Sequence, residues 1–270
     1  MAVTEFQTGI LKRLAGNRIA SGETYIAGGL ALNYQLRGAR YSADIDVFNN
    51  SIDALHSAAE MDMSALAAAG YSVSLKRERD FIVEAAVSLK GETTDIQWVR
   101  DSAYRFFPLV EDELLGWTLH PFDLATNKLL ALAGRTVPRD WVDAISCSES
   151  IQPLGLLAWA ASGKDPGLSP RFILETAART HYAQSEIDIA VRTDVRLDVA
   201  ALSKKWHEMI ESARTMISFL PAGEAGKAVI CKDGKLFNGT EEQLAKAIET
   251  GDVAFHEGRI CGAWPQIAND

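Results

Sequence analysis

The chain has 270 residues, a formal net charge of −9 and an apolar content of 47%. This composition is typical of a globular protein with enough apolar side chains for one large domain or two smaller ones. The negative charge argues against a surface covered with basic residues for gripping duplex nucleic acid, although a local basic groove remains compatible with it.

The first half of the chain is predicted to mix helices with strands. Helical spacing of apolar residues and the positions of glycines predict three helices, over 4–19, 29–36 and 52–69. Short alternating or β-branched segments predict strands over 23–27, 42–48, 71–76, 81–89 and 93–99. The turn at 90–92 predicts that the last two strands form a hairpin, and a second hairpin is predicted between 107 and 119.

After His120 the pattern becomes mainly helical. Helices are predicted over 122–133, 139–145, 154–161, 171–182 and 199–219. A linker at 221–226 leads into a small tail with two strands around an Asp233-Gly234 turn, a helix over 241–249 and a strand near Val253. The prediction is therefore an α+β protein: a head over 1–120 with a mixed sheet and helices, a helical region over 121–220, and a small α/β tail over 221–270.

The cysteines and the N-terminus bear on the compartment. The three cysteines, Cys147, Cys231 and Cys261, are odd in number and form no CxxC spacing, so neither a disulfide framework nor a zinc cluster is predicted. The N-terminus lacks the apolar run of a secretory signal, and no segment approaches the roughly 20 apolar residues of a membrane span. We therefore expect a cytoplasmic protein without a membrane partner.

The segment over 25–48, YIAGGLALNYQLRGARYSADIDVF, carries the functional signal. A predicted strand leads into Gly28-Gly29 at the start of a helix, where backbone amides and the helix dipole favour a phosphate. The next strand carries Asp44 and Asp46, whose i, i+2 spacing points both carboxylates to one face. Two adjacent carboxylates repel each other unless they share a cation, and Mg²⁺ prefers hard oxygen ligands that it shares with substrate phosphates.

Asp95, on the second arm of the predicted hairpin, is the best candidate for a third carboxylate. It is interpreted either as a metal ligand or general base of a two-metal site, or as an exposed hairpin residue. Each element alone is common in proteins, and an Asp-x-Asp on a strand is more often a solvated edge. The order and separation of the elements together favour a nucleotidyl-transfer site.

The segment GGLALNYQLRGARYSADIDVF resembles the first motif of the AbiEii/AbiGii-type nucleotidyltransferase toxins. That motif has a Gly-Gly or Gly-Ser, a helix, an Arg-x-Ser/Thr and an Asp-x-Asp, and here Arg40, Ser42, Asp44 and Asp46 occupy the last four positions. Gly29 stands where the wider superfamily has a serine. The resemblance covers about residues 20–150.

A second segment, FDLATNKLLALAGRTVPRDWVDAI, resembles the second motif of that family. A helical lysine, an arginine and an Arg-Asp-x-x-Asp helix are matched by Lys128, Arg135, Arg139, Asp140 and Asp143. The resemblance implies a polymerase-β-like head and Mg²⁺-dependent transfer of a nucleotide from a nucleoside triphosphate. It also implies a toxin of a toxin–antitoxin or phage-defence system, with an antitoxin protein as partner and RNA, in some cases tRNA, as acceptor.

These motifs define the predicted site. Gly28 and Gly29 are expected to hold the triphosphate through backbone amides, with Arg40 and Ser42 nearby, and Arg40 either touches phosphate or pairs with an aspartate. Lys128 is expected to contact the β- or γ-phosphate, with a solvated helix lysine as the alternative, and Asp143 to orient it. The pair of Arg139 and Asp140 is interpreted as a structural brace between helices.

Two other functions stay open at the level of sequence. A small-molecule nucleotidyltransferase of the antibiotic-modifying kind would share the same head and metal chemistry, and an acidic surface would attract a cationic antibiotic. A non-catalytic protein that keeps the fold is the third possibility, although the joint presence of Asp44, Asp46 and Lys128 argues against loss of activity.

Overall fold

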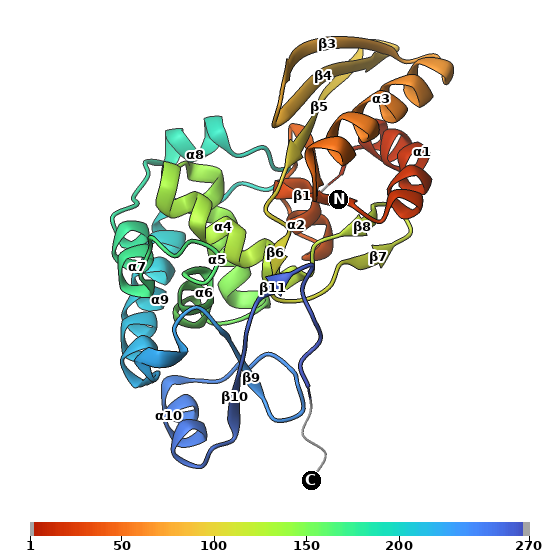
Figure 1. The fold of residues 1–270 in the computed structure, drawn as a ribbon. Coiled ribbons are helices and arrows are strands. Elements are labelled where there is room, and N and C mark those ends of the chain that lie inside the picture. The colour runs from red at the N-terminus through yellow and green to blue at the C-terminus, as the bar shows by residue number, and fades with distance from the viewer. Residues whose placement is uncertain (1–2, 267–270) are drawn as a thin grey trace. The chain divides into compact units, whose positions relative to one another are not determined.

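The computed structural model describes residues 3–266, and the chain divides into two compact units. The first unit comprises Met1–Tyr104 and Leu109–His120, and the second comprises Arg105–Pro108 and Pro121–Asp270. Figure 1 shows the strands of the first unit in orange to yellow-green and the helices of the second in green to blue.

The first unit is a mixed sheet with three helices. The helices are α1 (Glu5–Ser21), α2 (Gly28–Gln35) and α3 (Ile52–Ala68). The strands are β1 (Thr24–Ala27), β2 (Asp44–Asn49), β3 (Ser72–Arg79), β4 (Ile82–Leu89), β5 (Glu92–Arg100), β7 (Val110–Asp112) and β8 (Gly116–Thr118). Their order across the sheet is β3-β4-β5-β2-β1-β8-β7. Strand β2 runs parallel to β5, and β1 runs parallel to β8, whereas the other neighbours are antiparallel.

Capping residues fix the helix ends that the sequence suggested. Thr4 caps α1 and forms a reciprocal capping box with Gln7, and Gly22 ends the helix in the left-handed conformation at φ 66°. Ser51 caps α3 through the amide of Ala54. Helix α2 begins directly after β1, and no side chain caps its N-terminus. Its first turn begins with Gly28 and Gly29, whose backbone amides no capping side chain covers.

The central strands bury one face and leave the other half-exposed. Ile45 and Val47 of β2 and Ile96 and Trp98 of β5 are buried on the face that α3 contacts. The alternate residues of β2, β4 and β5 are only partly buried. The period-two pattern thus determines which side chains of β2 belong to the core and which lie on the opposite face.

The second unit is mainly helical. Its helices are α4 (Pro121–Arg135), α5 (Pro138–Ser150), α6 (Leu154–Ala161), α7 (Pro170–Ala178), α8 (Gln184–Ala190), α9 (Val199–Phe219), the 3₁₀ turn η1 (Ala222–Glu224) and α10 (Glu241–Glu249). Its strands are β9 (Ala228–Cys231), β10 (Val253–His256) and β11 (Arg259–Ile260), and the short strand β6 (Tyr104–Arg105) begins at the boundary between the units. Strands β9 and β10 pair antiparallel.

The tail packs on the helices through one apolar cluster. Leu156 and Trp159 of α6 and Met216 of α9 share this cluster with Val229 of β9 and Leu244 of α10. The strand predicted after the Asp233-Gly234 turn is reduced to a single bridge between Ile230 and Leu236. Helix α8 was not predicted from the sequence. Among residues 3–266 there is no helix with the length and apolar composition that a membrane span requires.

Candidate active site

Strand β2 places Asp44 and Asp46 on the half-exposed face of the sheet. The buried residues Ile45 and Val47 alternate with them and fix the strand against the core. Because residues i and i+2 of a strand point to the same side, the two carboxylates stand next to each other, as the sequence predicts.

The backbone of Gly28 lies directly against one of these carboxylates. Ala27, the residue before it, stands opposite Asp46 in the pairing of β1 with β2. A Cβ atom on Gly28 would lie only 1.9 Å from Oδ2 of Asp46, and Gly28 has a positive φ of 69°. Both the space and the backbone conformation therefore require glycine at this position. The structure thus brings together Gly28, which is predicted to hold the triphosphate, and Asp46, the predicted metal ligand.

Gly29 makes room for Arg40. A Cβ atom on Gly29 would lie 2.4 Å from Nη2 of Arg40 and 3.5 Å from Oγ of Ser42. Ser42 Oγ in turn donates a hydrogen bond of 2.8 Å to Oδ1 of Asp44. Arg40 and Ser42 are both buried. Gly29 thus leaves space that the guanidinium of Arg40 occupies.

Asp95 stands beside Asp44 on the neighbouring strand. The two residues are paired in register between the parallel strands β2 and β5. The carboxylate of Asp95 also accepts a hydrogen bond of 2.6 Å from Nζ of Lys76 on β3. Across residues 3–266, no group of three or more His, Cys, Asp or Glu side chains is arranged to hold a metal ion. The third carboxylate is next to the predicted pair, but its side chain is bound to a lysine.

The donors present fit a magnesium ion held by two carboxylates. Asp44 and Asp46 supply the hard oxygen ligands that Mg²⁺ accepts, and this ion commonly keeps several waters and shares substrate phosphates rather than requiring an all-protein cage. Asp46 reaches over the backbone of Gly28, at the N-terminus of α2, where phosphate oxygens find amide donors.

Comparison with known proteins identifies the fold. No model of a known protein family matches the chain, and no curated protein matches it. The chain is similar to the crystal structure of JHP933 from Helicobacter pylori, with a TM-score of 0.51 at 16% identity over 80% of this chain and 95% of that one. It is also similar to MenT4, a nucleotidyltransferase toxin from Mycobacterium tuberculosis, with a TM-score of 0.55 at 11% identity over 87% of this chain and 84% of that one.

The chain has the nucleotidyltransferase fold. This confirms the fold that the resemblance of the first motif implies. At this level of identity the likeness concerns the fold alone.

The second motif forms a buried ion cluster in the second unit. Nζ of Lys128 on α4 lies 2.8 Å from Oδ1 of Asp140 and 3.1 Å from Oδ2 of Asp143, both on α5. Nε of Arg135 donates to Oδ2 of Asp140 at 2.6 Å. Lys128 is buried, so it is not the solvated helix lysine of the alternative reading. Its contact with phosphate stays a prediction.

Asp140 joins α4 to α5, but through partners other than the predicted Arg139. Lys128 and Arg135 both reach it from α4, because residues seven apart on a helix lie on the same face. Burial alone would raise the pKa of Asp140, but the hydrogen bonds from Arg135 and the charge of Lys128 outweigh it and lower that pKa. Asp143 contacts Lys128 as the sequence suggested.

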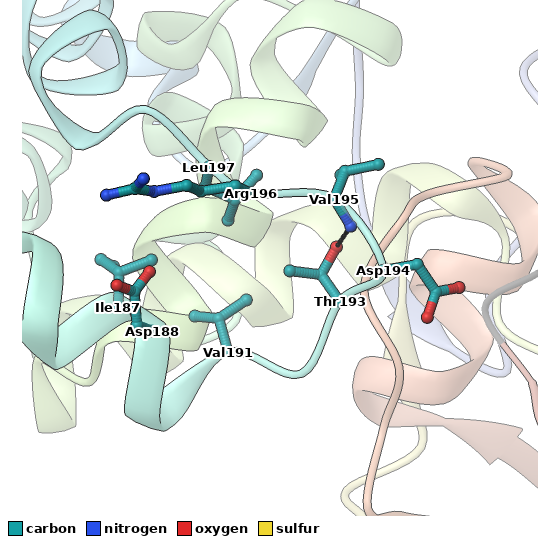
Figure 2. A pocket seen from close by; sticks show the side chains of 8 residues that line it. All are labelled: Ile187, Asp188, Val191, Thr193, Asp194, Val195, Arg196 and Leu197. Atoms are coloured by element: carbon teal, nitrogen blue, oxygen red, sulfur yellow. Dashed lines mark hydrogen bonds between the residues drawn. The ribbon is translucent and has the colours of Figure 1, made fainter.

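A hollow of about 290 Å³ lies at the turn between α8 and α9 (Figure 2). Its wall is formed by residues of the second unit, Ile187, Asp188, Val191, Thr193, Asp194, Val195, Arg196 and Leu197. None of the predicted site residues belongs to this wall. We therefore assign the candidate site to the carboxylate face of β2 and not to this hollow.

Lys76 is the residue of the carboxylate face that the sequence analysis did not single out. It lies on the edge strand β3, 19 positions before its partner Asp95. The pairing of β3 with β4 and of β4 with β5 brings them together. The second of these pairings follows from the turn at 90–92, whereas the first, with its register shift, has no signal in the local sequence pattern.

Proposed function

We propose that this protein transfers a nucleotide from a nucleoside triphosphate to a hydroxyl acceptor, with Mg²⁺ at Asp44 and Asp46. One observation supports this above all: the carboxylate of Asp46 lies on the backbone of Gly28, where even a Cβ atom would overlap it. The proposed metal ligand is therefore next to the helix terminus that we propose for phosphate binding, in a chain with the nucleotidyltransferase fold.

The reaction breaks a phosphoanhydride bond and forms a phosphoester bond. The acceptor oxygen forms a bond to the α-phosphorus, the bond from that phosphorus to the bridging oxygen breaks, and pyrophosphate leaves. The acceptor proton must pass to a base, and Asp95 beside Asp44 is the candidate. The amides of Gly28 and Gly29 orient the triphosphate, while Ser42 holds the carboxylate of Asp44 in place.

Asp44 and Asp46 would hold the metal ion, and Asp95 is the proposed third ligand if it does not act as base. A bound divalent ion neutralises the charge that develops on the phosphate oxygens during transfer. Arg40, packed on Gly29, adds a fixed positive charge beside the same helix terminus. In this proposal, the Arg40 guanidinium and the carboxylates of Asp44 and Asp46 surround the reacting phosphate.

We further propose that the acceptor is a hydroxyl of an RNA, such as tRNA, or of a protein. We also propose that the protein acts in the cytoplasm as the toxin of a toxin–antitoxin or phage-defence pair. The support is the similarity in fold to MenT4, which is described as a nucleotidyltransferase toxin, and the match to both motifs. A neighbouring gene for a small antitoxin protein would agree with this role, and harmless overexpression in a bacterial host would contradict it.

The test is transfer of label from α-labelled nucleoside triphosphates in the presence of Mg²⁺. Total RNA, a protein extract and a panel of cationic aminoglycosides serve as separate acceptors. We expect label in RNA or protein, lost in Asp46→Ala and retained in Glu60→Gln, which removes an exposed carboxylate of α3.

Label in the aminoglycosides would instead support a small-molecule transferase, which the net charge of −9 favours by attracting cations. Absence of label from every acceptor, with all four nucleoside triphosphates, would contradict the proposed activity.

A further inference from the structure

The edge strand β3 contains a bulge at Lys76. Leu75 stands opposite Ala85 and Arg77 stands opposite Glu84, so β3 advances by two residues while β4 advances by one. A bulge of this kind sets two residues against one and re-aims their side chains. With regular pairing, Arg77 would stand opposite Val83, on the buried face of the sheet. The bulge moves Arg77 to the half-exposed face.

Two consecutive cations consequently face the side of the sheet that carries the site. Nζ of Lys76 lies 2.6 Å from Oδ1 of Asp95, and Nη2 of Arg77 lies 3.1 Å from Oε2 of Glu84. Asp95 is in register with Asp44, whereas Glu84 is one strand further from β2. Of these two cations, Lys76 is therefore the one that contacts a carboxylate adjacent to the proposed metal ligands.

We propose that Lys76 is a tethered cation that occupies Asp95 until a divalent metal ion displaces it, which makes it a positioning residue of the site. This inference rests on the proposed function and deepens it. The observation that carries it is the juxtaposition of the Lys76 ammonium, the third carboxylate Asp95 and its in-register neighbour Asp44.

The physical reason is charge balance on one face of the sheet. Asp44, Asp46 and Asp95 place three carboxylates on adjacent positions of β2 and β5, and they repel one another when no cation is present. Lys76 supplies one positive charge from within the chain. Its side chain is 43% exposed and that of Asp95 34%. An ion pair in such contact with water is weak, so a divalent ion can replace the ammonium.

The contact with Asp95 gives the position of Lys76 a reason beyond ordinary edge-strand charge. Charged side chains on edge strands commonly prevent sheet-to-sheet aggregation, and Glu78 and Arg79 of β3 fit that role. Such protection needs no contact with a particular carboxylate. Lys76 instead reaches across β4 to a carboxylate of β5, and the bulge adds Arg77 to the same face.

The experiment measures Mn²⁺ binding to the full chain by electron paramagnetic resonance, without nucleotide or acceptor. We expect Lys76→Met to tighten Mn²⁺ binding about three- to five-fold, the amount that loss of a partly exposed ion pair allows. Arg77→Met is the matched control, because it removes a neighbouring cation whose partner is Glu84. Its effect is expected to stay below about two-fold.

A second pair of variants distinguishes direct competition of Lys76 and the metal ion for Asp95 from the general electrostatic effect of removing a positive charge. In an Asp95→Asn background, Lys76→Met is expected to change Mn²⁺ affinity by less than about 1.5-fold, because the shared carboxylate is gone. An equal effect of Lys76→Met in both backgrounds, or equal effects of Lys76→Met and Arg77→Met, would overturn the proposal.

Labelling of lysines in the wild-type chain gives an independent readout. With an amine-reactive reagent and mass spectrometry, Mg²⁺ is expected to raise the labelling rate of Lys76 at least about two-fold, since the ammonium loses its partner. Lys90, in the exposed turn after β4, is the internal control and should not respond. An equal labelling rate of Lys76 with and without Mg²⁺ would contradict the displacement of Lys76 from Asp95.

The outcomes also distinguish this inference from the proposed function. Mn²⁺ binding that depends on Asp44 and Asp46 but not on Lys76 leaves the proposed function standing and removes the inference. Absence of Mn²⁺ binding in both the wild-type chain and Lys76→Met contradicts both.

Discussion

Aspartates are concentrated in two regions of this molecule, and their surroundings differ: one group is buried in ion pairs and the other is half-exposed. In the second unit, Asp140 is buried between Lys128 and Arg135, and Asp123 lies 2.7 Å from Nζ of Lys164. In the first unit, Asp44 and Asp46 stand half-exposed on one face of β2, and Asp46 lies against the backbone of Gly28. The same side chain is thus a structural element in one unit and a candidate ligand in the other.

The difference follows from the energy of a buried charge. A carboxylate removed from water must be paired and hydrogen-bonded, otherwise it destabilises the fold by several kcal/mol. A carboxylate at a half-exposed strand position retains part of its hydration, so it can remain ready for an external cation. Burial and pairing, rather than residue type, separate the two roles.

The largest expected effect is on the buried cluster. Asp140→Asn should lower the free energy of unfolding by about 3 kcal/mol, because Lys128 and Arg135 both lose a buried anionic partner. Denaturant unfolding measures it. Glu175→Gln is the control, since the pair of Glu175 with Arg214 is exposed and its loss should cost less than about 1 kcal/mol. Equal costs would remove the distinction between the regions.

The next effect is a dependence on pH. The folded-state pKa of Asp140 is lowered, so its contribution to stability is present above the ordinary pKa of aspartate and is lost as the pH falls through the lowered value. The roughly 3 kcal/mol difference between wild type and Asp140→Asn should therefore shrink below about 1 kcal/mol at the acid end. Unfolding between pH 7 and pH 2.5 measures it, and a difference that grows towards acid would contradict the assignment.

A smaller effect on stability is expected at Gly28, whose backbone lies against the carboxylate of Asp46. Gly28→Ala should cost about 1–2 kcal/mol of stability, because its φ of 69° is unfavourable for alanine and the new Cβ atom displaces the carboxylate of Asp46. Nucleotidyl transfer should fall at least about tenfold. Gly16→Ala is the control: this helix position has open space, so stability should rise by up to about 1 kcal/mol. Full activity of Gly28→Ala would exclude the proposed phosphate floor.

The smallest expected effect on stability is at the proposed metal ligand. Asp44→Asn should change the free energy of unfolding by less than about 1 kcal/mol, because the side chain is half-exposed and the Ser42 hydroxyl still has an acceptor. Mn²⁺ binding should nevertheless be lost. A cost as large as that of Asp140→Asn would mean that Asp44 is structural, like the aspartates of the second unit.

Much of the fold could be predicted because local chemistry determines it. Helices α6 and α9 have the bounds expected from their apolar spacing, and β2 follows from the alternation around Ile45 and Val47. The short helix α8 was missed because only Ile187 of its seven residues is buried, so it lacks an apolar stripe.

The candidate site was predictable mainly where its parts are close in sequence, with Asp95 on the separate hairpin as the exception. Gly28, Asp44 and Asp46 belong to one strand–helix–strand unit, and their spacing indicates their proximity. The partners of Lys128 and the bulge at Lys76 depend on how helices and strands pair in three dimensions. All residues of β3 after Leu75 are charged, so no apolar alternation there locates the shift in register.

The central claim is that Asp44 and Asp46 share a divalent ion beside the backbone of Gly28. Anomalous diffraction from crystals containing Mn²⁺ and a non-hydrolysable nucleoside triphosphate tests it most directly. The account predicts a manganese peak about 2 Å from an oxygen of each carboxylate, with triphosphate oxygens at the N-terminus of α2. A peak elsewhere, or a triphosphate bound away from Gly28 and Gly29, would contradict it.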